Sequence, residues 1–100
     1  KIFNTANAFA ALKNDGSVIT WGNSGIGGDS SSVSDDLANG VSNIFSSALA
    51  FAALKNNGSV ITWGLSDYGG DSSSVSSQLT SGVSEIFSND VSFAAILVED

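Results

Sequence analysis

The hydrophobic pattern of the chain centres on one stretch that occurs twice, at positions 9–22 and 51–64. In the first copy an apolar run, Phe-Ala-Ala-Leu-Lys, is joined to a β-branched run, Ser-Val-Ile-Thr-Trp, by Asn-Asp-Gly; the second copy has Asn-Asn-Gly. Two short runs joined through Asp-Gly or Asn-Gly are typical of a β-hairpin with a primed turn, whose two central residues need positive φ. Each copy therefore predicts a hairpin with a tight primed turn.

Apolar residues occupy both faces of the predicted strands. Within positions 50–55, Phe51 and Ala53 alternate with Ala52 and Leu54, so that both faces are hydrophobic. A strand of this kind belongs to a sheet that is covered on both sides. The small alanines would let a neighbouring sheet approach closely. We therefore expect sheets that stack on one another.

The whole pattern repeats every 42 residues. Phe9, Phe51 and Phe93 begin the same phrase, and about two-thirds of the positions are identical between the two whole copies. A fixed period of this length indicates units that bury their apolar faces against their neighbours. The chain is thus a single repeat domain, 1–100, that divides into the tail of one repeat (1–8), two whole repeats (9–50 and 51–92) and part of a third (93–100).

Each repeat predicts three antiparallel strands. The first lies at 41–45, recurs at 83–87 and is truncated at 1–3. The second lies near 50–55 and the third at 59–63. The sequence therefore predicts a mostly β fold of small sheets, resembling the blades of a propeller; a β-prism or another stacked β-sheet array is the alternative.

A connector rich in serine and glycine, at 69–82, follows the third strand. Val75 and Leu79 lie four residues apart, as on one face of a helix, and Gly82 ends the segment. Asp71 or a following serine is a suitable N-cap. We expect one or two helical turns here, with an extended loop as the alternative because serine is a poor helix former.

Composition excludes several classes of function. The chain has no Cys and no His, which removes thiolate metal sites and the commonest general base. Its net charge is −7, with only three Lys and Arg residues, so a nucleic-acid partner is not expected. No apolar run approaches the roughly 20 residues of a membrane helix. The chain begins at Lys1 without a signal-peptide pattern, which predicts a mature product or a piece of a longer protein.

Few residues are candidates for catalysis or metal binding. Asp29 and Asp71 follow Gly-Gly in both repeats and could bind Ca²⁺, but one carboxylate in each connector is fewer than Ca²⁺ usually needs, and helix capping explains both. The acidic positions 35–36, 85 and 90 are not repeated and offer no acid–base pair of the glycosidase kind. The sequon at 57–59 falls in the predicted turn. We expect no enzyme activity, no cofactor and no metal.

Aromatic residues are the candidates for ligand contact. Trp21, Trp63 and Tyr68 could form a surface on which a sugar stacks. Trp recurs with the strand pattern, which favours packing of each Trp against the next repeat. Tyr68 does not recur, because Ile26 stands at its position in the first repeat.

The phrase Ala-Leu-Lys-Asn-Asp-Gly-Ser-Val-Ile-Thr-Trp-Gly, preceded by Val-x-x-Ile-Phe, resembles the repeat of the regulator of chromosome condensation family. The resemblance covers about half of each repeat and implies a β-propeller of small antiparallel blades. The segment after Trp-Gly departs from it, since the family has a Gly-Gln-Leu-Gly-like stretch and often Pro there. The nucleotide-exchange and chromatin-binding roles of the family are not expected here. In style the phrase is closer to long tandem arrays in large bacterial surface or secreted proteins.

The sequence thus predicts a structural or interaction module rather than an enzyme. Two repeats with fragments are too few to close a propeller of four to eight blades. Open sheet edges and apolar faces would remain. We therefore expect either a homo-oligomer or a part of a larger protein, at a bacterial cell surface or outside the cell. A carbohydrate-binding, lectin-like module is the alternative function.

Overall fold

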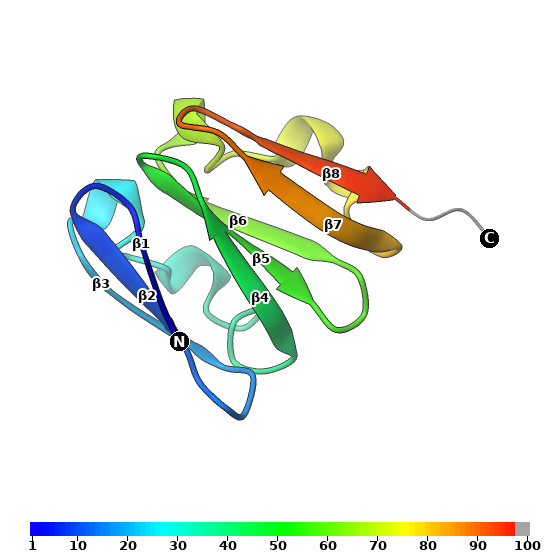
Figure 1. Cartoon of the computed structure of the whole chain (residues 1–100), viewed down its shortest axis with the longest axis horizontal. Coiled ribbons are helices and arrows are strands. Elements are labelled where there is room, and N and C mark those ends of the chain that lie inside the picture. The colour runs from blue at the N-terminus through cyan, green and yellow to red at the C-terminus, as the bar shows by residue number, and fades with distance from the viewer. Residues whose placement is uncertain (98–100) are drawn as a thin grey trace.

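A computed structural model describes residues 1–97 of the chain, without the side chains at 74, 76 and 77 (Figure 1). It contains eight strands in three antiparallel sheets, and no α-helix occurs within the described residues, which confirms the mostly β fold. The first sheet consists of β1 (Ile2–Asn4), β2 (Ala8–Leu12) and β3 (Val18–Gly22). The second consists of β4 (Val41–Ser46), β5 (Ala50–Lys55) and β6 (Val60–Gly64). The third contains β7 (Val83–Ser88) and β8 (Phe93–Leu97).

Both predicted hairpins are present, but the primed turn is wrong. The Gly16 N–H donates to the Lys13 carbonyl at 3.0 Å, and the Lys13 N–H donates to the Ser17 carbonyl at 2.9 Å. Gly16 alone has positive φ, +83°, whereas Asp15 does not. This is a three-residue loop, in which a type I turn precedes a left-handed glycine. The Asp15 carboxylate accepts from the N–H and the hydroxyl of Ser17 and so holds the type I form.

The sheets pack face to face in chain order, with a core between each pair (Figure 1). Ala8 and Ala10 of β2 belong to the same buried cluster as Phe51 and Ala53 of β5. Ala52, on the other face of β5, belongs to a second cluster with residues of β7. The expectation that both faces of the middle strand are covered is therefore confirmed, and alanine permits the close approach.

Backbone hydrogen bonds link successive sheets at both ends of the strands. The Ala6 N–H donates to the Ala48 carbonyl at 2.8 Å, and the Ala48 N–H donates to the Asp90 carbonyl at 3.0 Å. At the other end, the Val41 N–H donates to the Gly16 carbonyl at 2.9 Å, a bond that recurs 42 residues later between Val83 and Gly58. These repeated bonds fix the offset of each sheet relative to its neighbour.

Each connector contains two short 3₁₀ helices: η1 (Ser24–Ile26) and η2 (Ser31–Val33) in the first, η3 (Ser66–Tyr68) and η4 (Ser73–Gln78) in the second. The prediction of one or two helical turns is confirmed, although the turns are tighter than α-helical ones. Asp71 lies two residues before the start of η4, and its carboxylate accepts from the Ser73 N–H at 2.9 Å. Within the described residues, no helix is long and apolar enough to cross a membrane.

The partial third repeat (93–100) supplies β8, and its last three positions, 98–100, lie outside the described residues. Strand β8 pairs with β7 in the register that β5 has with β4, including the irregularity near the start of the first strand.

Candidate interaction surfaces

The junction between the first two sheets is built around an aromatic pair and a glycine. Phe51 and Trp63 are cross-strand partners whose rings stack with centroids 5.4 Å apart. Both are buried, and Phe51 lies against Gly27 of the preceding connector, where a Cβ would be 2.5 Å from the ring. The Trp63 indole N–H donates to the Gly27 carbonyl at 3.2 Å. Only a glycine fits here, because its φ is +114° as well.

Side-chain hydroxyls hold the connector in this position. The Thr5 hydroxyl, which is buried, donates to the Ile26 carbonyl at 2.9 Å. The Thr20 hydroxyl lies 2.8 Å from that of Ser30, within hydrogen-bonding distance. The second sheet and its connector have the same contacts, from Ser47 to Tyr68 and from Thr62 to Ser72. Each connector is therefore tied to its own sheet and presents its glycine to the next.

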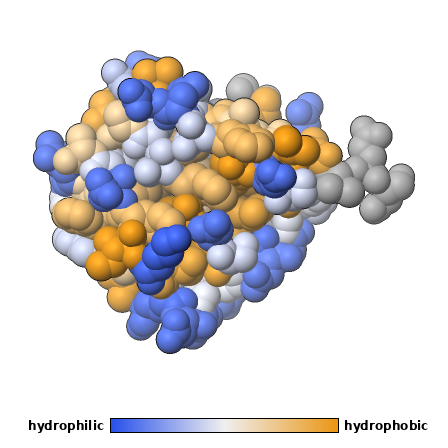
Figure 2. All heavy atoms as spheres, in the orientation of Figure 1, coloured by the Kyte–Doolittle hydropathy of each residue, from blue (hydrophilic) through white to orange (hydrophobic). Residues whose placement is uncertain are grey.

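The outer face of the first sheet carries the same aromatic pair without a cover. Phe9 and Trp21 stack with centroids 5.6 Å apart, but they are 42% and 44% exposed, against 0% and 3% for Phe51 and Trp63. Ile2 and Ile19 are also exposed on this sheet. We call these four residues the leading face. In Figure 2, hydrophobic residues reach the surface over the strands, with hydrophilic residues among them.

The leading face is identical in composition to a face that is buried elsewhere in the molecule. Its residues correspond, 42 positions later, to Ile44, Phe51, Ile61 and Trp63. All four of these pack in the core between the first two sheets. The same side chains on the same pleated surface are thus buried at one junction and open at the end of the chain.

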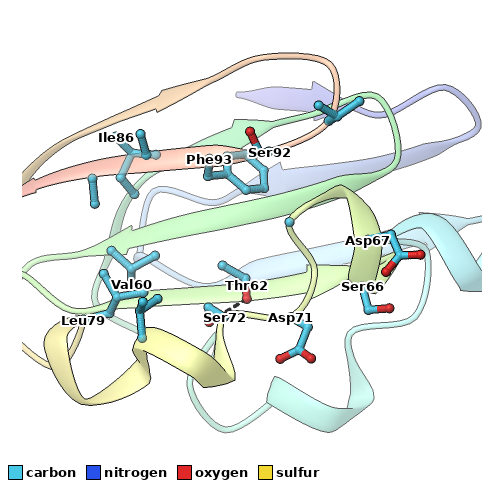
Figure 3. Close-up of a pocket in the computed structure, with 15 residues that line it drawn as sticks. Val60, Thr62, Ser66, Asp67, Asp71, Ser72, Leu79, Ile86, Ser92 and Phe93 are labelled. Carbon is cyan, nitrogen blue, oxygen red and sulfur yellow. Dashed lines mark hydrogen bonds between the residues drawn. The ribbon is translucent and has the colours of Figure 1, made fainter.

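A groove of about 290 Å³ lies at the other end, between the second connector and the third sheet (Figure 3). Val60 and Leu79 lie on one side of it, and Ile86 and Phe93 on the other. The Thr62 hydroxyl donates to the Ser72 hydroxyl at 2.9 Å, and both residues belong to the lining. We call this feature the β8 groove.

The three aromatic residues proposed for sugar contact lie on different elements. Trp63, on β6, is 3% exposed, so its ring offers no free face to a ligand. It packs against the preceding repeat, through Gly27, and the prediction of packing against the next repeat is wrong. Trp21 lies on the leading face, and Tyr68 is half-buried in η3. The three do not form one exposed surface.

The connector aspartates act on their own backbone. The hydroxyl and the N–H of Ser31 donate to the Asp29 carboxylate and hold its pKa below the ordinary value. Ser73 lowers the pKa of Asp71 in the same way. Residues 1–97 contain no group of three His, Cys, Asp or Glu side chains that could hold a metal ion.

Sequence reasoning missed the residues that shape the junction. Gly27 and its counterpart Gly69 recur at the 42-residue spacing, and so do the hydroxyl residues at positions 5 and 47. The recurrence was a usable signal, but spacing alone does not tell which side chain packs on a glycine. That assignment needs the neighbouring sheet in place.

Comparison with models of known protein families finds none that matches the chain, and comparison with curated proteins finds no match either.

Proposed function

We propose that the chain is a non-enzymatic structural and interaction module, whose leading face packs on another sheet of the same kind. The partner sheet belongs either to a neighbouring repeat of a larger protein or to another copy. The observation that carries this proposal is the match between the leading face and the buried face of the second sheet.

Energetics favour a neighbouring repeat over a free second copy. The exposed parts of Phe9 and Trp21 amount to roughly 200 Å² of apolar surface, worth about 5 kcal/mol when removed from water. Association of separate molecules costs an estimated 4–15 kcal/mol or more in lost freedom, so this contact alone would hold two copies only weakly. A repeat on the same chain is already near, and most of that cost disappears.

We further propose that these sheets are blades of a propeller, as the resemblance to the regulator of chromosome condensation repeat implies. The stacking of three-stranded sheets at an offset of 42 residues supports this part of the proposal. A β-prism is the alternative arrangement. The acidic composition, rich in serine, asparagine and glycine, is compatible with the bacterial surface or secreted location that we propose.

A fusion of positions 1–42, with the Trp21 of the added copy replaced by phenylalanine, ahead of residue 1 tests the proposal, because it keeps the repeat in phase and adds no second exposed tryptophan. The added connector should cover the leading face, so the emission of Trp21 should shift to the blue and the melting temperature should rise. A matched fusion with Gly27→Val in the added copy should show neither change. Unchanged emission and melting in the unmodified fusion would refute the proposal.

Carbohydrate binding is the second candidate, favoured by the exposure of Trp21. A tryptophan in water emits at longer wavelength than a buried one. Because Trp63 is buried and Trp21 is exposed, a change in the long-wavelength emission reports on Trp21. Titration with simple sugars and oligosaccharides should alter this emission if the leading face is a sugar site. An absence of response across sugar classes excludes the lectin function.

A further inference from the structure

The dipeptide Asn-Gly occurs twice in the chain, at 39–40 and at 57–58, in two different structural settings. Because glycine has no side chain, its main-chain nitrogen can approach the carboxamide carbon of the asparagine before it. At the equivalent positions, 42 residues away, the other repeat has Asp15-Gly16 and Ser81-Gly82. Each Asn-Gly therefore belongs to one repeat only, and the two can be compared within one molecule.

The pair Asn57-Gly58 is held by the hairpin turn. The Asn57 side-chain carbonyl accepts from the Ser59 N–H at 3.0 Å and from the Ser59 hydroxyl at 2.7 Å. The Gly58 N–H donates to the Lys55 carbonyl at 2.9 Å. The carboxamide and the nitrogen beside it are thus both bound elsewhere, and they can meet only if the turn opens.

The pair Asn39-Gly40 has no such restraint. It lies between η2 and β4, and the Asn39 side chain is exposed. Within residues 1–97, neither the Asn39 carboxamide nor the Gly40 N–H makes a hydrogen bond. The carboxamide can therefore turn toward the Gly40 nitrogen while the fold stays intact.

We propose that Asn39-Gly40 is a site of spontaneous deamidation in the folded protein, whereas the turn protects Asn57-Gly58. The Gly40 nitrogen gives up its proton to base and forms a bond to Cγ of Asn39. The bond between Cγ and Nδ2 breaks, ammonia leaves, and a cyclic succinimide remains. Water then opens the ring. Cleavage of the bond between the nitrogen and Cγ gives aspartate, and cleavage of the bond between the nitrogen and the main-chain carbonyl carbon gives isoaspartate.

The modified position adjoins the junction between the first two sheets. The Gly40 carbonyl accepts from the Asn56 N–H at 2.7 Å, and the Val41 N–H donates to the Gly16 carbonyl at 2.9 Å. Gly16 lies so close that a Cβ on it would be 2.9 Å from the Gly40 nitrogen. Isoaspartate lengthens the main chain by a methylene group just before these contacts, so it should loosen the junction. Aspartate leaves the main chain unchanged.

Mass spectrometry of the whole chain, incubated at mildly alkaline pH with and without urea, tests the assignment. A protease that cleaves after lysine separates the two sites, because Lys55 lies between them. In urea the turn is lost, and both sites should react at similar rates. In the folded protein, Asn39 should react roughly tenfold or more faster than Asn57 relative to the ratio in urea, because only Asn57 must first break its hydrogen bonds.

A serine substitution provides the matched control. Ser59→Ala removes one donor to Asn57 and should speed the reaction there, with no effect at Asn39. A rate ratio in the folded protein that equals the ratio in urea overturns the proposal, and so does a Ser59→Ala variant that is folded by circular dichroism and reacts no faster at Asn57.

Melting temperatures test the effect on the junction. The melting temperature of the parent should fall during incubation, whereas that of Asn39→Ser, which carries the serine found at position 81, should fall less. Fresh Asn39→Asp should melt with the fresh parent, because it carries the new charge without the longer main chain. An equal fall in parent and Asn39→Ser, or a fresh Asn39→Asp that melts as low as the incubated parent, would refute the loosening by isoaspartate.

Discussion

The two tryptophans provide a matched pair for testing how much the sheet junction contributes to stability. Trp63 and Trp21 occupy the same register position on β6 and β3, and each stacks on the phenylalanine opposite. They differ in cover, since Trp63 is 3% exposed and Trp21 is 44% exposed. Replacement of each by alanine therefore separates packing between sheets from packing within a sheet.

Trp63→Ala should lower the free energy of unfolding by about 3–5 kcal/mol, because it removes a buried aromatic ring and leaves a cavity against the first connector. Trp21→Ala should cost no more than about half as much, since nearly half of its surface is already in water and solvent fills the space. The loss expected for Trp63→Ala is a large share of the free energy of unfolding of a typical domain, which is about 5–15 kcal/mol.

Phenylalanine substitutions isolate the indole hydrogen bond. Trp63→Phe keeps the stack on Phe51 but leaves the carbonyl of the buried Gly27 without its donor, which should cost about 1–3 kcal/mol. Trp21→Phe should cost much less, because its indole N–H has no corresponding contact within the described residues.

Urea unfolding followed by far-ultraviolet circular dichroism measures all four variants, since the signal does not depend on the replaced tryptophan. Protein concentration should be low enough for the chain to be monomeric. Equal losses for Trp63→Ala and Trp21→Ala would refute the argument, because the first connector would then contribute nothing to the burial of Trp63.

Three further predictions concern the connector. Gly27→Ala should destabilise the protein by more than about 2 kcal/mol in the same urea assay, because its Cβ would meet the Phe51 ring at 2.5 Å. Gly25→Ala is the control and should be nearly neutral, because its Cβ would meet only a side-chain oxygen, at 3.6 Å. The pKa of Asp29 is lower in the folded protein than in the unfolded chain. Its contribution to the free energy of unfolding is therefore fully present above the ordinary Asp pKa of about 3.9, and it is lost as the pH falls through the pKa of the folded protein. Asp29→Asn retains an acceptor for the Ser31 N–H, so it should leave the melting temperature at neutral pH unchanged. The decline of the melting temperature below about pH 4 should become shallower in this variant. The same pH profile in variant and parent would contradict the contribution of the Asp29 carboxylate to stability. A chelator should leave the melting temperature unchanged, and a fall would instead indicate a stabilising metal ion.

The sequence by itself determined the strands and their pairing. Alternating apolar residues, the Asn-x-Gly turns and the 42-residue spacing placed the described strands to within about a residue of their observed bounds, because these signals are local. The apolar character of both faces of β5 also predicted that sheets stack, since each face needs a cover.

The turn type and the form of the connector were decided by contacts that the pattern does not specify. Asp15 accepts two hydrogen bonds from Ser17 and holds a type I turn where Asp-Gly alone favours a primed one. In the connectors, serine hydroxyls and paired glycines leave only short 3₁₀ turns.

Only the tertiary structure decided which surfaces are buried and which are open. Phe9 and Phe51 have nearly identical neighbours in the sequence, yet one is exposed and the other is fully buried. The difference lies in whether a preceding connector presents a glycine to the ring, and that contact joins residues from different repeats. Burial depends on such neighbours in space, so a repeated sequence specifies the shape of each sheet but not the cover that it receives.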